Sequence, residues 1–211
     1  SIPSFRLAAL TLLLSATVAA QGSDDCATAQ SIAGSGPHAF DNTAASPSPS
    51  LPSCFGFGST EDIWFRWTAS QDAHVFLSAV GQSNFVVRAG VYEGGSCGTL
   101  SLVGCRAHYG NSFDRPLLFL AEAGESYYVL ISSQLVGTTG TGSFTLTESV
   151  PLLNPATGSS YELIDASVSW SEANGRASFL VWHGCYGQLA SLTSPAERAW
   201  VDQNFAMGSV W

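Results

Sequence analysis

The short motif most suggestive of catalysis lies at residues 94–98, which read GGSCG and match G-x-S-x-G. That pattern forms a nucleophile elbow only where a strand precedes the serine and a helix follows it, so that the hydroxyl is raised above a sheet. Here residues 99–103 have strand character, and Cys97 is a candidate half-cystine. With 21 Gly in the chain, chance matches are common. We therefore predict no catalytic role for Ser96.

The histidines show no metal-binding spacing. The chain has four, His38, His74, His108 and His183, with no pair four residues apart and no H-E-x-x-H sequence. Zinc needs ligands that converge on a tetrahedron, which this spacing does not suggest. We expect these side chains at exposed or core-edge positions. A thiolate–imidazole pair between His183 and Cys185 is not predicted, because neighbours two residues apart in a turn rarely point at each other.

Two acidic pairs are candidates for other chemistry. Glu61 and Asp62 are adjacent in a predicted strand and so point to opposite faces, which does not suit acid–base work on one substrate. Asp24 and Asp25 could help hold Ca²⁺ together with carbonyl oxygens, but a solvated N-terminal edge is the favoured interpretation. The sequence therefore identifies no catalytic residue and no metal ligand.

Composition limits the class of protein. The chain has 211 residues, 45% of them hydrophobic and only 11% charged, so a packed core is expected. Sixteen acidic residues against seven Arg give a net charge of −9, and there is no basic run. Nucleic acids and anionic membrane surfaces both need clustered cations, so we exclude them as partners.

The first twenty residues have the pattern of a secretory signal peptide. Arg6 is followed by the apolar run Leu7–Ala20, with small residues placed for cleavage before Gln21. The run is shorter than the roughly 20 apolar residues that a membrane span needs. We predict a secreted protein, extracellular or at the cell surface, with no membrane span.

Residues 24–149 have the pattern of a β-sandwich or jelly roll. Residues 62–69 place the apolar side chains of Ile63, Phe65 and Trp67 on one face and the side chains of Trp64, Arg66 and Thr68 on the other. This two-residue period is typical of a half-buried strand. Further strands are predicted at residues 74–80, 86–92, 117–121, 127–132 and 142–148. Trp67 is expected in the core, whereas Trp64, beside Arg66 on the other face, is a candidate for exposure. No sugar-stacking platform is assigned, because large aromatic side chains are more often buried.

The pattern changes at residues 150–155, a predicted linker. A short strand at 160–164 precedes Ser169 and Glu172, a capping box that opens a helix with Trp170 on its apolar face. Ser194-Pro195 opens a second helix. Residues 156–211 provide too little sheet to cover these helices, so we expect a fragment, incomplete at both ends, with an α+β unit cut short at Trp211.

Five cysteines fit an exported protein. Cys26, Cys54, Cys97 and Cys105 lie in the sandwich region and allow three pairings, among which spacing does not choose. Cys185 is left unpaired.

Residues 24–148 resemble the bacterial pre-peptidase C-terminal domain, a secreted β-sandwich. The matching segments are DDCATA at 24–29, FDNT at 40–43, EDIWF at 61–65, SCGTL at 96–100 and AGESYY at 123–128, with Cys54 and Cys105 in order. The resemblance implies Cys26–Cys54 and Cys97–Cys105 disulfides. It implies no catalysis, since such domains are appended to exported proteases and other proteins and are thought to aid substrate attachment or export.

Residues 154–211 resemble the first half of a C-type lectin-like domain. The matching segments are NP at 154–155, YEL at 161–163, SWSEA at 169–173, GQLASL at 187–192 and SPAE at 194–197, and VW at 210–211 resembles the start of a further strand. The calcium and sugar ligands of this family would lie after Trp211, so none is assigned here. Ca²⁺ is expected as a cofactor only if a continuation carries those ligands.

These observations predict a mainly β, secreted and non-enzymatic binding or adhesion protein. Its expected ligand is a glycan or a protein, bound through the lectin-like unit. One alternative is the non-catalytic N-terminal part of a secreted enzyme, such as a protease, whose catalytic domain lies elsewhere. Another is a structural module of the cell surface or matrix with no small-molecule ligand.

Overall fold

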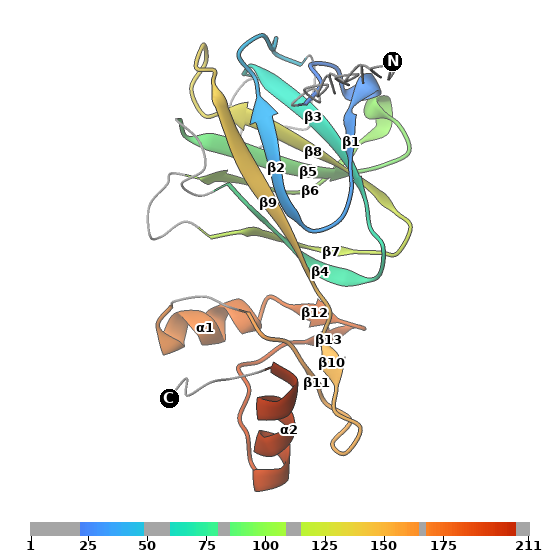
Figure 1. The fold of residues 1–211 in the computed structure, drawn as a ribbon, viewed down its shortest axis with the longest axis vertical. Helices are drawn as coiled ribbons and strands as arrows, with labels where there is room; N and C mark the ends of the chain where they lie inside the picture. Colours follow the sequence, from blue (N-terminus) through green and yellow to red (C-terminus); the bar gives the residue numbers. More distant parts are fainter. Residues whose placement is uncertain (1–21, 49–59, 80–84, 109–114, 165–167, 206–211) are drawn as a thin grey trace, which may run out of the picture.

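A computed structural model of the chain describes residues 22–48, 60–79, 85–108, 115–164 and 168–205. Residues 22–149 form two β-sheets that pack face to face, and a smaller unit with two helices follows (Figure 1). The predicted mainly β fold with a sandwich is therefore confirmed.

The first sheet has five strands in the order β1-β3-β8-β5-β6. Their bounds are β1 Gln30–Ile32, β3 Asp62–Thr68, β5 Val87–Glu93, β6 Ser101–His108 and β8 Ser126–Ser133. All neighbours are antiparallel except β1 and β3, which are parallel. The central position of β8 explains its nearly continuous burial, since both of its faces are covered.

The second sheet has four antiparallel strands in the order β2-β9-β4-β7. Their bounds are β2 Gly36–Asp41, β4 Ala73–Ser78, β7 Leu117–Ala121 and β9 Thr141–Ser149. Successive strands therefore alternate between the sheets at several points, as sandwich connections do.

The core lies between the two sheets and follows the alternation of the strands. Ile63, Phe65 and Trp67 on β3 point into it and are at most 3% exposed. From the opposite sheet, Val75 on β4 and Phe144 on β9 meet them, and the rings of Phe65 and Phe144 lie 5.0 Å apart. Trp67 is a core residue as predicted.

Most strands of the sandwich fall within one or two residues of the predicted ranges, but two of them, β1 and β2, were not predicted. β1 has three residues, and β2 contains Gly36 and Pro37, so neither carries a clear alternating pattern. β6 extends to His108, well beyond the predicted end at residue 103.

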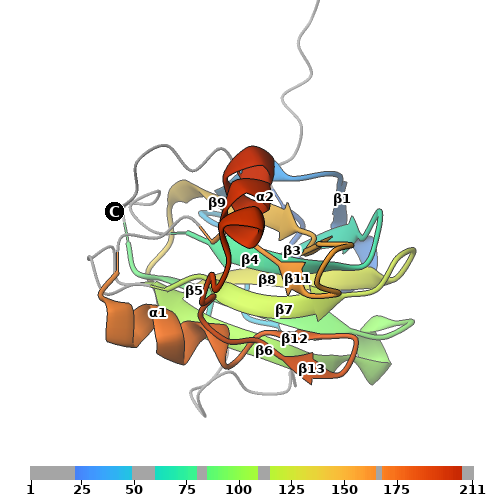
Figure 2. The ribbon, with the colours of Figure 1, turned by 90° about the horizontal axis from the view of Figure 1, so that it is seen from below.

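The C-terminal unit lies beneath β4 and β7 (Figure 1), and the view from below confirms this position (Figure 2). It contains two helices and two pairs of short antiparallel strands. The bounds are β10 Leu152–Leu153, β11 Ser160–Tyr161, α1 Trp170–Ala177, β12 Val181–Trp182, β13 Cys185–Tyr186 and α2 Pro195–Phe205.

The predicted linker is partly a strand. Leu152 and Leu153 form β10 and pair with β11. Asn154 closes the turn between them: its side chain accepts from the Ala156 amide at 3.0 Å, and its carbonyl accepts from Gly158 at 2.8 Å. Because Asn154 is only 1% exposed, this turn is a packed part of the fold.

Both predicted helix starts are confirmed. The Ser169 hydroxyl accepts from the Glu172 amide at 3.4 Å, and the Ser194 hydroxyl accepts from the Glu197 amide at 3.1 Å. Trp170 differs from the prediction, because its side chain is 72% exposed and not packed in a core.

In the described ranges the longest α-helix is α2, and neither it nor α1 has the length and apolar character needed to cross a bilayer.

Candidate functional site

The G-x-S-x-G segment does not form a nucleophile elbow. After β5, the chain turns through Gly94, and Cys97–Thr99 form a short 3-10 helix, η2. The Ser96 hydroxyl lies 3.1 Å from that of Thr99, and the next residue, Cys97, is disulfide-bonded. Ser96 therefore has a local structural role in the turn.

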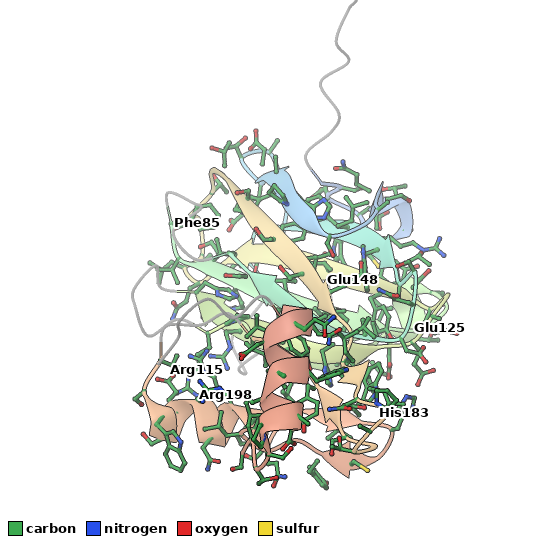
Figure 3. All side chains as sticks on the ribbon, turned by 60° about the horizontal axis from the view of Figure 1, so that its bottom comes forward. Phe85, Arg115, Glu125, Glu148, His183 and Arg198 are labelled. Carbon is green, nitrogen blue, oxygen red and sulfur yellow. A yellow bond between two sulfur atoms is a disulfide. The ribbon has the colours of Figure 1, made fainter. Side chains whose placement is uncertain are left out.

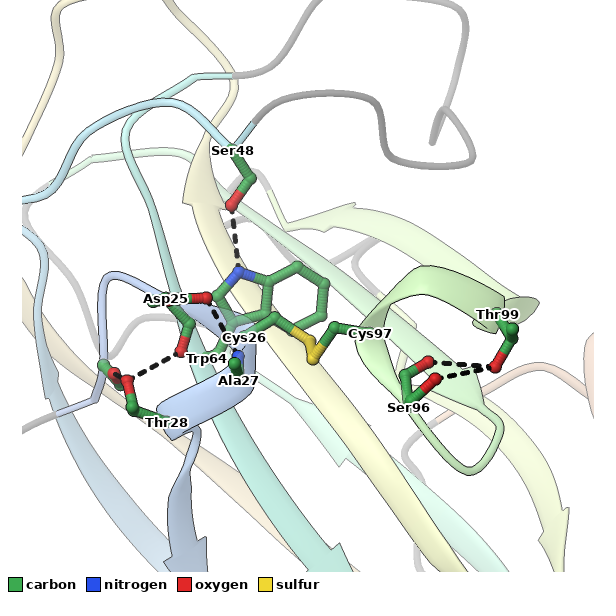
Figure 4. The surroundings of a disulfide bond; sticks show 10 residues. Asp25, Cys26, Ala27, Thr28, Ser48, Trp64, Ser96, Cys97 and Thr99 are labelled. Atoms are coloured by element: carbon green, nitrogen blue, oxygen red, sulfur yellow. Dashed lines mark hydrogen bonds between the residues drawn. A yellow bond between two sulfur atoms is a disulfide. The ribbon is translucent and has the colours of Figure 1, made fainter.

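The disulfide of this region joins Cys26 to Cys97 (Figure 4). The Cys26–Cys54 and Cys97–Cys105 pairing implied by the family resemblance is therefore wrong. Cys26 belongs to η1, a 3-10 helix at Cys26–Thr28, and the fold brings η1 beside η2 although 71 residues separate the two cysteines. Cys105 is also disulfide-bonded, and Cys54 lies outside the described residues.

Trp64 lies under this disulfide and is fully buried, so the expectation that it is exposed is wrong. Its indole nitrogen donates to the Ser48 hydroxyl at 3.1 Å, and its ring lies 5.6 Å from that of Tyr92. With Cys26, Leu100 and other buried residues it forms a second apolar cluster on the outer face of the five-stranded sheet. Sequence alternation assigned Trp64 to that outer face correctly but could not show that η1 and η2 cover it.

Polar groups adjoin this cluster. In register across three strands, Asp62 on β3 lies beside Ser132 on β8, which lies beside Arg88 on β5, and all three are at most 5% exposed. Burial raises the pKa of Asp62 despite hydrogen bonds from Ser48, and the charge of Asp24 raises it further. Burial also raises the pKa of Tyr92 to about 12, an effect that Asp62 increases and Arg88 opposes.

Glu61 and Asp62 have separate partners, as their opposite orientations predicted. A Glu61 carboxylate oxygen accepts from the Gly137 amide at 3.0 Å, whereas Asp62 accepts from the Ser48 amide at 2.7 Å. Each carboxylate therefore fixes a different loop to the end of β3.

Asp24 and Asp25 also act as local acceptors. Asp24 accepts from the amide and hydroxyl of Ser46, and Asp25 caps η1 by accepting from the Ala27 amide at 2.9 Å. Among the described residues, no three His, Cys, Asp or Glu side chains gather in a way that could hold a metal ion.

Two of the four histidines are more deeply buried than the exposed or core-edge positions expected for them, whereas His38 and His183 lie at such positions. His74 and His108 are buried, at 3% and 2% exposure. His38 points inward beside Phe144, with ring centroids 5.3 Å apart, and burial lowers its pKa although a backbone hydrogen bond opposes that change. His183 is exposed in the turn between β12 and β13 with a positive φ of 47°.

His74 joins the sandwich to the C-terminal unit. Val75 and Leu77 point into the core, so His74 is on the outer face of β4, the face toward the C-terminal unit. Its Nδ1 lies 2.6 Å from Glu162 Oε2, and its Nε2 lies 3.0 Å from the Val181 carbonyl oxygen.

The contact of His74 with Glu162 is nearly closed to water. The side chains of His74 and Glu162 are 4% and 6% exposed, and the ring of Trp182 lies 5.5 Å from the imidazole. Burial lowers the pKa of His74, but its hydrogen bonds to Glu162 and Val181 and the Glu162 charge outweigh burial, so that the pKa is raised. Sequence reasoning missed this pair because its members lie 88 residues apart.

A second contact between the units is a partly exposed ion pair. Arg115, just before β7, lies 3.0 Å from Glu172 on α1, and Arg176 one turn later lies 2.8 Å from the same oxygen. Figure 3 shows Arg115 on the side of the molecule where α1 lies, with His183 on the opposite side.

Within the C-terminal unit, Glu197 attaches α2 to the rest. It accepts from the Tyr161 hydroxyl on β11 and from the Thr193 amide at 2.8 Å. These hydrogen bonds, that of Tyr161 first, lower the pKa of Glu197. The rings of Tyr161 and Trp200 lie 5.5 Å apart.

Exposed aromatic side chains distinguish the C-terminal unit from the sandwich. Among the described residues, the exposed Trp, Phe and Tyr are Trp170, Phe179 and Tyr186, at 72%, 79% and 80% exposure. All three belong to the C-terminal unit. Cys185, next to Tyr186, is an exposed free cysteine in the described part of the chain.

In comparisons with known proteins, no family model and no curated protein matched this chain.

Proposed function

We propose that this chain is a secreted, non-enzymatic binding or adhesion protein whose C-terminal unit carries the ligand contacts. The distribution of aromatic side chains supports this proposal most directly. The large aromatic residues of the sandwich, such as Trp64, Trp67 and Phe65, are fully buried. Those exposed among the described residues lie between Trp170 and Tyr186.

An exposed ring can contribute to binding in two ways. It provides a flat apolar face on which a sugar ring or an apolar partner side chain can stack, and Trp and Tyr also carry a hydrogen-bond donor. Aromatic residues are accordingly enriched where proteins bind partners. The expected ligand is therefore a glycan or a protein. The resemblance of residues 154–211 to a C-type lectin-like domain supports the same choice and makes Ca²⁺ a cofactor to test.

The structural roles of the residues considered for catalysis or metal binding support a non-enzymatic function. Ser96 bonds to Thr99 within a turn, Asp24 holds Ser46, and Glu61 holds Gly137. Each side chain has a role in the fold that explains its position. The signal-like N-terminal segment and the Cys26–Cys97 disulfide are consistent with secretion into an oxidising compartment.

Binding of the full chain to a printed oligosaccharide panel and to immobilised secreted proteins tests this proposal, each with Ca²⁺ and with a chelator. For any ligand found, Trp170→Ala, Phe179→Ala and Tyr186→Ala are compared by biolayer interferometry. At least one should weaken binding by about tenfold, the scale of an interface hot spot.

Val136→Ala is the matched control, because Val136 is 78% exposed in a loop of the sandwich. It should bind like the unaltered chain. Equal binding by all four variants would place the ligand elsewhere, and turnover of a panel compound would contradict the non-enzymatic assignment.

A further inference from the structure

We propose that the His74–Glu162 pair is a proton-dependent latch, which holds the C-terminal unit on the sandwich in mild acid and weakens as the pH rises. The proposal concerns the joint between the two units and does not depend on the ligand. It rests first on the geometry of the imidazole, both of whose nitrogens face acceptors.

Those two acceptors require two protons. One hydrogen must lie between Nδ1 and Glu162 Oε2, 2.6 Å apart, and one between Nε2 and the Val181 carbonyl oxygen, 3.0 Å apart. An imidazolium beside a carboxylate provides both, and so does a neutral imidazole beside a protonated carboxyl group. The two arrangements hold the same number of protons, so the pair carries one proton more than a neutral imidazole beside a carboxylate, whichever atom holds the shared one.

If the His74–Glu162 pair loses one of these two protons, its hydrogen bonds can no longer all be made. A neutral His74 carries one N–H, so in either tautomer one ring lone pair faces the carboxylate or the carbonyl oxygen. Water cannot readily compensate, since both side chains are at most 6% exposed. In the described part of the chain, the other carboxylate oxygen, Glu162 Oε1, is buried without a hydrogen-bond partner. The contact between His74 and Glu162 is therefore stable only while the pair holds the second proton.

The described neighbours of His74 are neutral side chains or titratable groups with contacts of their own. Across the sheet, Ser149 on β9 and Leu120 on β7 lie opposite His74. Asp72, two residues earlier, accepts from the Ala123 amide at 2.8 Å. From the C-terminal unit, Trp182 is neutral, and His183 contacts the Trp182 ring from its exposed turn. Among the described residues, Glu162 is the charged side chain that the structure pairs with His74.

The sign of the pH dependence follows from the raised pKa of His74. Detachment exposes the imidazole and returns its pKa toward the ordinary value of about 6.5. The attached state binds the proton more tightly, so attachment is fully favoured below about pH 6.5 and is lost as the pH rises through the higher pKa of the attached state. Each pH unit between those two pKa values changes the detachment equilibrium about tenfold.

The test uses the full chain with two measurements between about pH 5.5 and about pH 8.5, a range that spans ordinary imidazole titration. Nitrogen-15 NMR of the histidine rings gives the pKa of His74. Hydrogen exchange of the amides in β11 and β12, corrected for the intrinsic effect of pH, gives the detachment equilibrium. We expect a His74 pKa above about 6.5 and exchange that rises with pH through that pKa.

Glu162→Gln distinguishes a latch from a merely structural contact. The amide can donate to Nδ1 of a neutral His74 while Nε2–H donates to Val181, so all partners are satisfied without the extra proton. In this variant the His74 pKa should fall below the ordinary value, and exchange should increase on acidification. The direction of the pH dependence is thus reversed.

His183→Asn is the matched control. This exposed histidine lies in the β12–β13 hairpin, which also carries Val181, and Asn tolerates its positive φ of 47°. It should retain the pH dependence of the unaltered chain. The proposal is overturned if the unaltered chain shows a His74 pKa at or below the ordinary value, pH-independent exchange, or the same sign of pH dependence as Glu162→Gln. The histidine titration decides the matter even if Glu162→Gln fails to attach.

Discussion

At the scale of single residues, Gly90 is constrained by the buried ring beside it. A Cβ atom at this position would lie 2.9 Å from Cε2 and 3.2 Å from the hydroxyl oxygen of Tyr92. Tyr92 is 1% exposed and packs against Trp64, so its ring has no open space into which to move. A methyl group at position 90 must therefore displace the covering layer.

We predict that Gly90→Ala lowers the free energy of unfolding by about 1–3 kcal/mol, the usual cost of overpacking. Chemical denaturation followed by tryptophan fluorescence measures the change. Gly95→Ala is the control, since a Cβ there meets nothing within 4 Å, and it should stay within about 0.5 kcal/mol of the unaltered chain. Equal effects of the two substitutions would contradict the packing described here.

His38 gives a pH dependence opposite in sign to that of His74. Burial lowers its pKa, and its Nε2 is buried without a partner in the described structure. The unfolded chain therefore binds a proton that the folded chain resists. This group reduces stability as the pH falls below about 6.5.

We predict that His38→Phe, which keeps a ring beside Phe144, reduces the loss of sandwich stability between about pH 7 and about pH 5. Denaturant unfolding at several pH values measures the difference. His183→Asn should leave the pH dependence of sandwich unfolding unaltered. An undiminished loss in His38→Phe would show that another group causes it.

At the scale of elements, η1 and η2 are short helices whose positions depend on each other. Neither has the length to form alone, and the Cys26–Cys97 disulfide joins them over Trp64. Closing so long a loop restricts the unfolded chain strongly, so the double variant Cys26→Ser/Cys97→Ser should lose about 2–4 kcal/mol of stability. Calorimetry of this variant should show a lower melting temperature, and an unchanged one would contradict a stabilising role.

Peptide mapping without reduction tests the pairing directly. Cleavage after Arg leaves Cys26 and Cys54 on one peptide and Cys97 and Cys105 on another. We predict that these two peptides remain linked, whereas the pairing implied by the family resemblance would release them separately. Further cleavage after Phe40 and Leu100 separates all four cysteines and excludes the third pairing, Cys26 with Cys105.

The two helix caps allow a crossed comparison. Ser169→Ala should weaken α1 by about 1 kcal/mol without affecting α2, and Ser194→Ala should do the reverse. Hydrogen exchange resolved along the chain reports the two helices separately. Equal loosening of both helices by either substitution would indicate that the unit unfolds as a whole.

At the scale of the whole molecule, the two units differ in how much they bury. The sandwich has a continuous core between its sheets, with Phe40, Phe65 and Phe144 at 0% exposure. In the described part of the C-terminal unit, the buried apolar side chains are Leu180 and Val201. So small an apolar core cannot offset the entropy of ordering the segment.

We predict that residues 22–149 produced alone unfold cooperatively, whereas residues 150–211 alone do not. Circular dichroism melting curves of the two segments and of the full chain test this. Within the full chain, the C-terminal unit should gain protection from hydrogen exchange through its contacts with β4. A cooperative transition in the isolated C-terminal segment would show that it contains a sufficient core of its own.

The sequence by itself determined the features that depend on local periodicity and capping. The alternation around Phe65 fixes β3 and its core face, and Ser169 and Ser194 fix the starts of the helices, because each signal lies within a few residues of the element it specifies. Eight strands, seven of them in the sandwich, and both helices were predicted on this basis.

The tertiary structure alone decided which distant groups meet. The exposure of Trp170, the cover over Trp64, the partner of Cys26 and the burial of His74 against Glu162 could not be read from the sequence. Spacing and alternation assign a side chain to a face but do not say what packs on that face. Burial, disulfide partners and the protonation of a histidine depend on contacts between segments tens of residues apart, which only the folded chain brings together.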